Sequence, residues 1–117
     1  MSEPVKIAEV ADVEPGQAVQ IDHRMAGTGD NLCLARTESG EFFAVDNTCT
    51  HSLAWLADGW VEGDTIECPV HAAAFCLRTG EALTLPASEP VRAYQVEVRG
   101  SEVWLVGLRP GAAGDAP

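Results

Sequence analysis

The chain has 117 residues, of which 46% are hydrophobic, and its mean hydropathy is +0.01. These values fit one compact domain with a modest core and exclude a chain that is disordered throughout. Seven Lys and Arg against 18 Asp and Glu give a net charge of −11, which argues against nucleic acid or an anionic membrane surface as a partner. The N-terminal residues Met1 to Lys6 lack the layout of a secretory signal, and no apolar run approaches the roughly 18 residues that cross a bilayer. A cytoplasmic location is therefore expected.

Short segments rich in Val, Ile, Leu and aromatic residues alternate with Gly, Asp, Asn and Pro along the chain, without any long helical periodicity. This pattern predicts an all-β fold. The expected strands, in chain order, are Val5 to Ala8, Ala18 to His23, Asn31 to Thr37, Phe42 to Asp46, Trp60 to Val61, Thr65 to Glu67, Ala74 to Leu77, Arg92 to Val98 and Val103 to Gly107. A single helical turn is predicted within Leu53 to Asp58.

Turns are predicted where Gly, Pro, Asp or Ser cluster between these strands. Two of them, Glu38-Ser39-Gly40 and Arg99-Gly100-Ser101, join neighbouring strands as tight hairpins, which indicates an antiparallel sandwich or barrel. The chain is interpreted as one domain over residues 1–108. The tail over residues 109–117 is rich in Gly, Ala and Pro, has nothing to bury and is expected to be disordered.

Four cysteines in a chain expected in the cytoplasm indicate metal ligands or inert thiols rather than disulfides. Two of them are followed closely by a histidine, in Cys49-Thr50-His51 and Cys68-Pro69-Val70-His71. Two short loops placed side by side could present two thiolates to one metal ion and two imidazoles to another, which is the ligand arrangement of a Rieske [2Fe-2S] cluster. Cys33 and Cys76 have no such histidine and are expected to be small buried hydrophobic residues.

Other interpretations of the same residues remain open at this point. A tetrahedral zinc site has the same Cys₂His₂ inventory, although zinc sites usually pair Cys with Cys and His with His in each loop. A Cys–His dyad could also serve as a nucleophile, but two dyads in matching loops would be redundant, and an enzyme acting alone is the weaker hypothesis. The remaining histidine, His23, is predicted to be a solvated strand residue.

The pattern C-x-H, a gap and C-x-x-H resembles the Rieske fingerprint. The similarity to the Rieske ferredoxins of bacterial aromatic-ring oxygenases runs from Val5 to Val106. It extends to Leu56, Gly59, Glu62-Gly63-Asp64, Ile66-Glu67-Cys68-Pro69 and the segment Phe75 to Gly80. This resemblance implies a Rieske fold, in which an antiparallel β-sandwich or barrel base carries a small inserted cluster-binding subdomain at about residues 47–86.

By the same resemblance, one [2Fe-2S] cluster is held by Cys49, His51, Cys68 and His71, and Leu85 to Pro90 forms a third, proline-bearing loop that shields it. High-potential Rieske proteins carry a disulfide between the ligand loops and hydroxyl donors to the cluster. Here the corresponding positions are Ala54, Val70, Ala73 and Phe75, which favours the low-potential, ferredoxin-like branch.

The resemblance implies a soluble monomeric carrier of single electrons rather than an enzyme. Its donor is an NAD(P)H-dependent flavin reductase, its acceptor is the Rieske centre of a terminal aromatic-ring oxygenase, and His51 and His71 carry the electron. Asp46, Asp58, Glu62, Asp64 and Glu67 lie near the ligand loops in sequence and are expected to steer a basic partner. The alternatives are the small subunit of an assimilatory nitrite reductase, a stand-alone Rieske redox protein and a structural zinc module.

Overall fold

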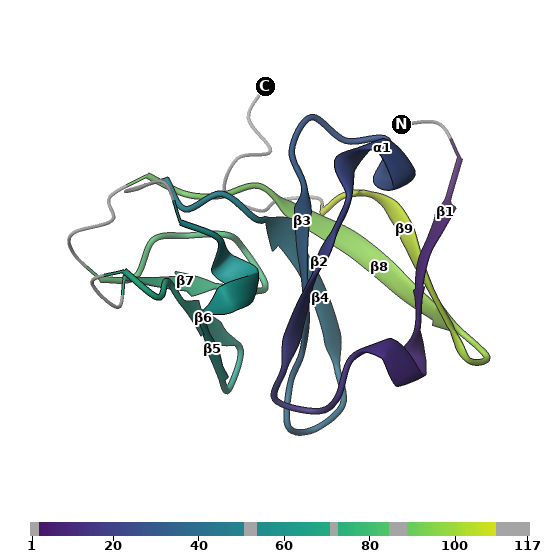
Figure 1. Ribbon diagram of the computed structural model, residues 1–117, viewed down its shortest axis with the longest axis horizontal. Coiled ribbons are helices and arrows are strands. Elements are labelled where there is room, and N and C mark those ends of the chain that lie inside the picture. Colours follow the sequence, from purple (N-terminus) through teal and green to yellow (C-terminus); the bar gives the residue numbers. More distant parts are fainter. Residues whose placement is uncertain (1–2, 51–53, 71–72, 85–88, 110–117) are drawn as a thin grey trace.

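The structure is a computed structural model that describes residues 3–50, 54–70, 73–84 and 89–109 (Figure 1). Its strands are β1 (Val5–Glu9), β2 (Ala18–Ile21), β3 (Leu32–Arg36), β4 (Phe42–Asp46), β5 (Trp60–Glu62), β6 (Thr65–Glu67), β7 (Ala74–Cys76), β8 (Ala93–Arg99) and β9 (Glu102–Leu108). The helices are α1 (His23–Ala26) and two short 3-10 helices, Val10–Asp12 and Leu56–Asp58. Each expected strand overlaps one of these strands, so the all-β prediction is confirmed.

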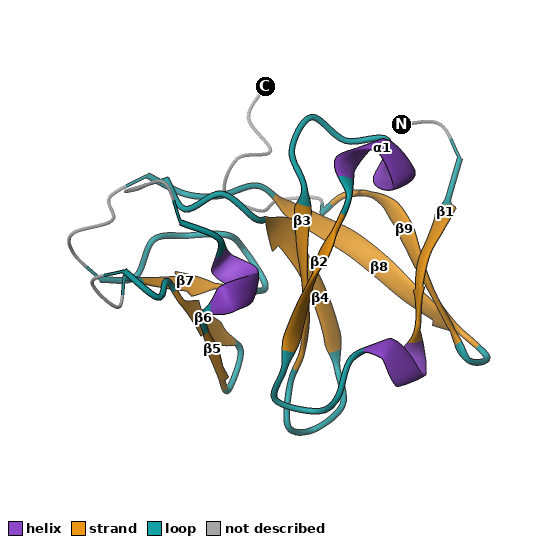
Figure 2. Cartoon of the chain, viewed as in Figure 1, coloured by secondary structure: helices purple, strands orange, loops and turns teal. Residues whose placement is uncertain are grey.

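The large sheet has the strand order β1-β9-β8-β4-β3-β2, and all of its paired neighbours are antiparallel. It curls into the base of the molecule (Figure 2). Both predicted hairpins are present, because the turn at Glu38-Ser39-Gly40 joins β3 to β4 and the turn at Arg99-Gly100-Ser101 joins β8 to β9. Gly40 has a φ of 95°, a conformation that glycine adopts without steric cost.

The central strands β3 and β4 are buried on both faces. Their alternate residues enter two different apolar clusters, because successive side chains of a strand point to opposite faces. Leu34 and Ala44 belong to the cluster inside the curled sheet, together with Tyr94 of β8. Cys33 and Val45 belong to the second cluster, which lies between the large sheet and the remainder of the chain. Burial on both faces explains why β3 and β4 are continuous apolar runs in the sequence.

The small sheet, β5-β6-β7, is inserted between β4 and β8 and lies beside the large sheet (Figure 1). Its inward side chains are Val61, Ile66 and Phe75, which occupy one cross-strand row and join the second apolar cluster. This second cluster contains side chains of both sheets and therefore packs the small sheet against the large one.

Two glycines permit close backbone approaches at the edges of this insertion. A Cβ atom at Gly59 would lie 1.7 Å from the Glu67 carbonyl oxygen, and one at Gly80 would lie 2.0 Å from the Val91 carbonyl oxygen. Neither position has room for a side chain, and Gly80 also has a φ of +81°. The two contacts fix where the small sheet begins and where the chain returns toward β8.

Two local predictions, for His23 and for Arg109, differ from the structure. His23 is exposed as expected, but it begins α1 instead of ending a strand, because the Asp22 side chain caps the helix by accepting from Arg24 N at 2.7 Å. The turn of helix predicted within Leu53 to Asp58 is present as the 3-10 helix Leu56–Asp58, whereas the 3-10 helix Val10–Asp12 has no counterpart in the predictions. Arg109, the first residue of the tail that was predicted to be disordered, donates its backbone N–H to the Ala93 carbonyl. The remaining residues of that tail lie outside the described residues.

Among the residues that the structure describes, no helix is long and apolar enough to cross a membrane.

Candidate metal centre

The two ligand candidates Cys49 and Cys68 open loops of the same construction. Cys49 N donates to the Ala54 carbonyl at 2.9 Å, and Cys68 N donates to the Ala73 carbonyl at 2.7 Å, so in each loop the bond returns five residues later. The residue before each cysteine is also paired across the loop, Thr48 with Trp55 and Glu67 with Ala74. The sequence similarity of the two ligand groups therefore corresponds to two loops closed at the base in the same way.

Both thiols lie at the bottom of their loops. Cys49 is 3% exposed and Cys68 is fully buried, and both belong to the apolar cluster between the two sheets. No disulfide joins any of the four cysteines. Two buried thiols in one cluster, each at the base of a short loop, suit a thiolate-ligated metal group. His51 and His71 lie outside the described residues, and within the described part no three His, Cys, Asp or Glu side chains are grouped as a metal site would need.

The segment that leads into the first loop is anchored by side chains that sequence reasoning missed. Asn47 is fully buried; its Oδ1 accepts from Ala57 N and its Nδ2 donates to Gln20 Oε1, both at 2.9 Å. The next residue, Thr48, donates from its backbone N and its hydroxyl to the Asp30 carboxylate at 3.1 and 3.2 Å. The sequence could have identified Asn47 as a candidate anchor, because it is a polar residue directly after the apolar strand and two positions before Cys49. Nothing in the sequence points to Asp30.

Thr84, which precedes the predicted third loop, and Glu89, which lies within it, are both hydrogen-bonded to residues near the ligand loops. Thr50 Oγ1 donates to the Glu89 carbonyl at 2.7 Å, and Ala74 N donates to Thr84 Oγ1 at 2.9 Å. Residues 85–88 of that loop lie outside the described residues. Thr50 and Ala74 follow Cys49 and Cys68 in sequence, so these bonds connect the third segment to each ligand loop in turn.

Four positions bear on the expected low reduction potential. Ala54, Ala73 and Phe75 are buried, the last two completely, whereas Val70 is 38% exposed. None of the four can form a disulfide or donate a side-chain hydrogen bond to a ligand sulfur.

Cys33 is fully buried as predicted, and burial raises the pKa of its thiol to about 12. Cys76 is only partly buried.

The carboxylates expected around the cluster divide into two groups. Asp46 accepts a hydrogen bond of 2.7 Å from the Tyr94 hydroxyl, and burial raises the pKa of Asp46, so it belongs to the base of the loop rather than to a docking face. Asp64 pairs with Arg78 at 3.1 Å. Asp58 and Glu62 are exposed and Glu67 is partly exposed, and no described residue forms an ion pair with any of these three carboxylates.

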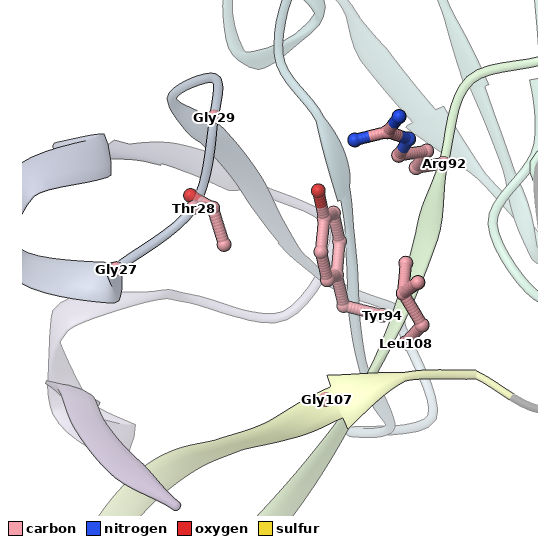
Figure 3. A pocket seen from close by; sticks show the side chains of 7 residues that line it. All are labelled: Gly27, Thr28, Gly29, Arg92, Tyr94, Gly107 and Leu108. Atoms are coloured by element: carbon pink, nitrogen blue, oxygen red, sulfur yellow. The ribbon is translucent and has the colours of Figure 1, made fainter. Parts of the chain in front are cut away.

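A cavity of about 280 Å³ lies elsewhere on the base (Figure 3). Tyr94 stands between the Gly27–Gly29 loop and Arg92, and Gly107 and Leu108 complete the lining. The lining includes neither Cys49 nor Cys68, the two ligand candidates that the structure describes. The cavity is therefore separate from the candidate metal centre.

Comparison with known proteins agrees with this site. Residues 3–95 match the family model described as the Rieske [2Fe-2S] domain. The 3-phenylpropionate/cinnamic acid dioxygenase ferredoxin subunit of Shigella boydii is 44% identical over 82% of this chain and 86% of the relative. The ferredoxin of carbazole 1,9a-dioxygenase from Nocardioides aromaticivorans has a similar structure, with a TM-score of 0.77 and 34% identity over 91% of this chain and 99% of that chain.

A third match is a chain in the complex of reduced oxygenase and oxidized ferredoxin of carbazole 1,9a-dioxygenase, with a TM-score of 0.78 and 33% identity over 92% of this chain and 95% of that chain. A nitrite reductase small subunit from Mycobacterium tuberculosis has a TM-score of 0.75 but only 22% identity, so it shows a common fold alone. The family match, the relatives and the paired cysteine loops lead to one conclusion: this chain belongs to the Rieske [2Fe-2S] domain family, whose cluster has Cys and His ligands.

Proposed function

We propose that the chain is a ferredoxin that passes single electrons from a flavin-dependent, NAD(P)H-oxidising reductase to the Rieske centre of a terminal aromatic-ring oxygenase. The observation that carries the proposal is the pair of equivalent loops that start at the buried Cys49 and Cys68. The bound [2Fe-2S] cluster supplies reversible one-electron chemistry. Relatives named as dioxygenase ferredoxin subunits, at 43–44% identity, support the choice of partner class.

The ligand set proposed for this cluster is Cys49 and Cys68 on one iron and His51 and His71 on the other. The buried position of the thiols supports a deeper site for the Cys-ligated iron. The histidines follow the cysteines by two and three residues in the sequence, and the proposal assigns them to the same two ligand groups. In this proposal the electron passes between the cluster and a docked protein, and no substrate is bound.

The same proposal includes a single domain over residues 1–108, with its cluster-binding part at about residues 47–86, a monomeric state and a cytoplasmic location. A shuttling carrier needs to leave one partner before it meets the next, which favours a monomer. The apolar cluster shared by both sheets supports one folding unit rather than two.

The ligand set is tested first by metal analysis of the purified protein. We expect about two iron and two sulfide ions per chain and a Rieske absorption and EPR spectrum. His51→Ala and His71→Ala should lose the cluster, because one iron is left with an open position. His23→Ala and Cys76→Ala are matched controls outside the loops and should keep it. Zinc in place of iron, or a normal spectrum in either loop variant, contradicts the ligand set.

The carrier role is tested with purified reductase and oxygenase, taken from the gene neighbourhood of this chain or from the Escherichia coli 3-phenylpropionate/cinnamic acid dioxygenase system. Wild-type protein should be required for NAD(P)H-driven oxygenase turnover, and the cluster-free His51→Ala variant should not support it. If neither oxygenase accepts its electrons while a nitrite reductase does, the proposed partner is wrong.

A further inference from the structure

Large apolar side chains are exposed unevenly over the molecule. Among the described residues they are Met25, Trp55, Trp60, Val70, Leu83, Val98 and Leu108. Four of these lie between residues 55 and 83, in the part of the chain that surrounds the ligand loops. Two of those four are tryptophans, Trp55 at 46% and Trp60 at 58% exposure. An exposed tryptophan keeps a large apolar surface in water, and such side chains are enriched in protein interfaces.

The two tryptophans occupy related places beside the two cysteines. Trp55 is bridged to Thr48, the residue before Cys49. Trp60 is the cross-strand partner of Glu67, the residue before Cys68. Each exposed indole therefore stands across from the entrance of one ligand loop. Trp60 is also on the outward face of β5, because its neighbour Val61 points into the apolar cluster between the sheets.

The indole N–H groups of the two exposed tryptophans differ from that of Trp104. In the large sheet, Trp104 Nε1 donates to Glu102 Oε1 at 3.1 Å. Among the residues that the structure describes, none accepts a hydrogen bond from the indole Nε1–H of Trp55 or of Trp60. A buried indole usually finds an acceptor for its N–H, and here the acceptor can come from a docked surface.

The charge around the tryptophans indicates what that surface looks like. From residue 37 to residue 77 the chain contains no Lys or Arg, whereas it contains Glu38, Glu41, Asp46, Asp58, Glu62, Asp64 and Glu67. Asp46 and Asp64 are engaged by Tyr94 and Arg78, which leaves Asp58, Glu62 and Glu67 closest in sequence to the tryptophans. An apolar recess bordered by Lys or Arg complements this composition.

We propose that Trp55 and Trp60 are the apolar anchors of the surface on which the oxygenase docks, one beside each cysteine loop. The proposal rests on the electron-carrier function above and adds the side chains that hold the complex together. Buried aromatic anchors supply most of the affinity of a typical interface and act on the dissociation rate. The surrounding carboxylates act on the association rate, which salt reduces. The two contributions can therefore be measured separately.

The test uses the oxygenase that wild-type protein reduces in the turnover assay. Trp55→Ser and Trp60→Ser should each raise the dissociation rate of the complex about 10- to 30-fold, the range expected of interface anchors. The turnover rate at saturating ferredoxin should stay within about twofold, because the cluster itself is untouched. Trp55→Phe and Trp60→Phe should restore most of the affinity, and the cluster spectrum should be the same in all four variants.

Matched controls come from exposed apolar residues far from the ligand loops. Met25 lies on α1 and Val98 lies next to the β8–β9 hairpin, and Figure 1 shows both elements away from the small sheet. Met25→Ser and Val98→Ser should leave the dissociation rate unchanged. Unchanged rates in both tryptophan variants, with wild-type turnover intact, overturn the docking surface but not the carrier function. A wild-type dimer that the tryptophan variants lose, measured by sedimentation, overturns it in favour of a second copy of this chain.

Discussion

Asp30 accepts two hydrogen bonds from Thr48, one from the backbone N at 3.1 Å and one from the hydroxyl at 3.2 Å. Asp30 lies in the segment between α1 and β3, whereas Thr48 immediately precedes Cys49. The base of the molecule thus holds the entrance of the first ligand loop through one carboxylate. The same carboxylate also accepts from Asn31 N at 2.8 Å, which orients it.

Removing this carboxylate should weaken the loop more than a comparable surface change. Asp30→Ala leaves Thr48 N without its acceptor, and the loss should lower the free energy of unfolding by about 1–3 kcal/mol. The exposed carboxylate Glu14 provides a control, and Glu14→Ala should change it by less than about 0.5 kcal/mol. Denaturant unfolding of the cluster-loaded protein gives both values. Equal values would mean that Asp30 does not anchor the loop.

The reduction potential should lie near the low end of the Rieske range, at about −150 mV. The reason is the absence of side-chain donors at Ala73 and Phe75, both fully buried. Ala73→Ser with Phe75→Tyr should raise the potential, because hydroxyl dipoles then favour the added electron. Voltammetry of the double variant and of Ala82→Ser, a partly buried position outside the ligand loops, measures the effect. A wild-type potential well above zero would contradict this explanation.

The rate of reduction by the flavin reductase should fall as salt rises from about 0.01 M to 0.5 M, because the Debye length shrinks from about 30 Å to a few Å. Glu62→Gln with Glu67→Gln should flatten this dependence and leave the spectrum intact. Asp64 is unsuitable for this set, because its neutralisation would also break the bond to Arg78. Stopped-flow rates at several salt concentrations decide the point. A wild-type rate that is indifferent to salt would assign the carboxylates to solubility alone.

Asp46 predicts a distinct pH dependence of stability. Its pKa is raised above the ordinary value of 3.8, mainly by burial, although the Tyr94 hydroxyl and Arg92 oppose the shift and Asp30 adds to it. A carboxyl with a raised pKa in the folded state binds its proton more tightly there, so stability falls as pH rises from 3.8 through the folded pKa. Asp46→Asn keeps an acceptor for Tyr94 and removes this titration.

The free energy of unfolding of Asp46→Asn should therefore increase relative to wild type as the pH rises from about 4 to 6. Denaturant titrations of both proteins across this range measure the difference. Glu14→Gln serves as the control and should show no such trend. A constant difference between Asp46→Asn and wild type would show that Asp46 titrates as an ordinary carboxyl.

The strands and both cysteine loops could be predicted from the sequence because their signals are local. Turn residues such as Gly40 and the alternation of apolar residues depend on neighbours in the chain. α1 could not be predicted, because four residues carry no helical periodicity and its start depends on the Asp22 side chain. The anchoring of Thr48 by Asp30 depends on two segments that only the folded sheet brings together.

The apolar residues of β3 and β4 also connect two parts of the molecule. Their two faces serve two clusters, so β3 and β4 are common to the base and to the loops that contain Cys49 and Cys68.

The depth of Cys33 affects how a cluster can be assembled in this protein. Its thiol is fully buried and stays protonated at physiological pH, because burial raises its pKa to about 12. Cys68 is equally buried but opens a ligand loop, whereas Cys33 lies within a strand that is paired on both sides, so we expect the Cys33 thiol to react slowly with iron, oxidants and alkylating reagents. We therefore expect iron and sulfide delivered to the folded chain to meet no competing thiolate on β3 unless the large sheet opens.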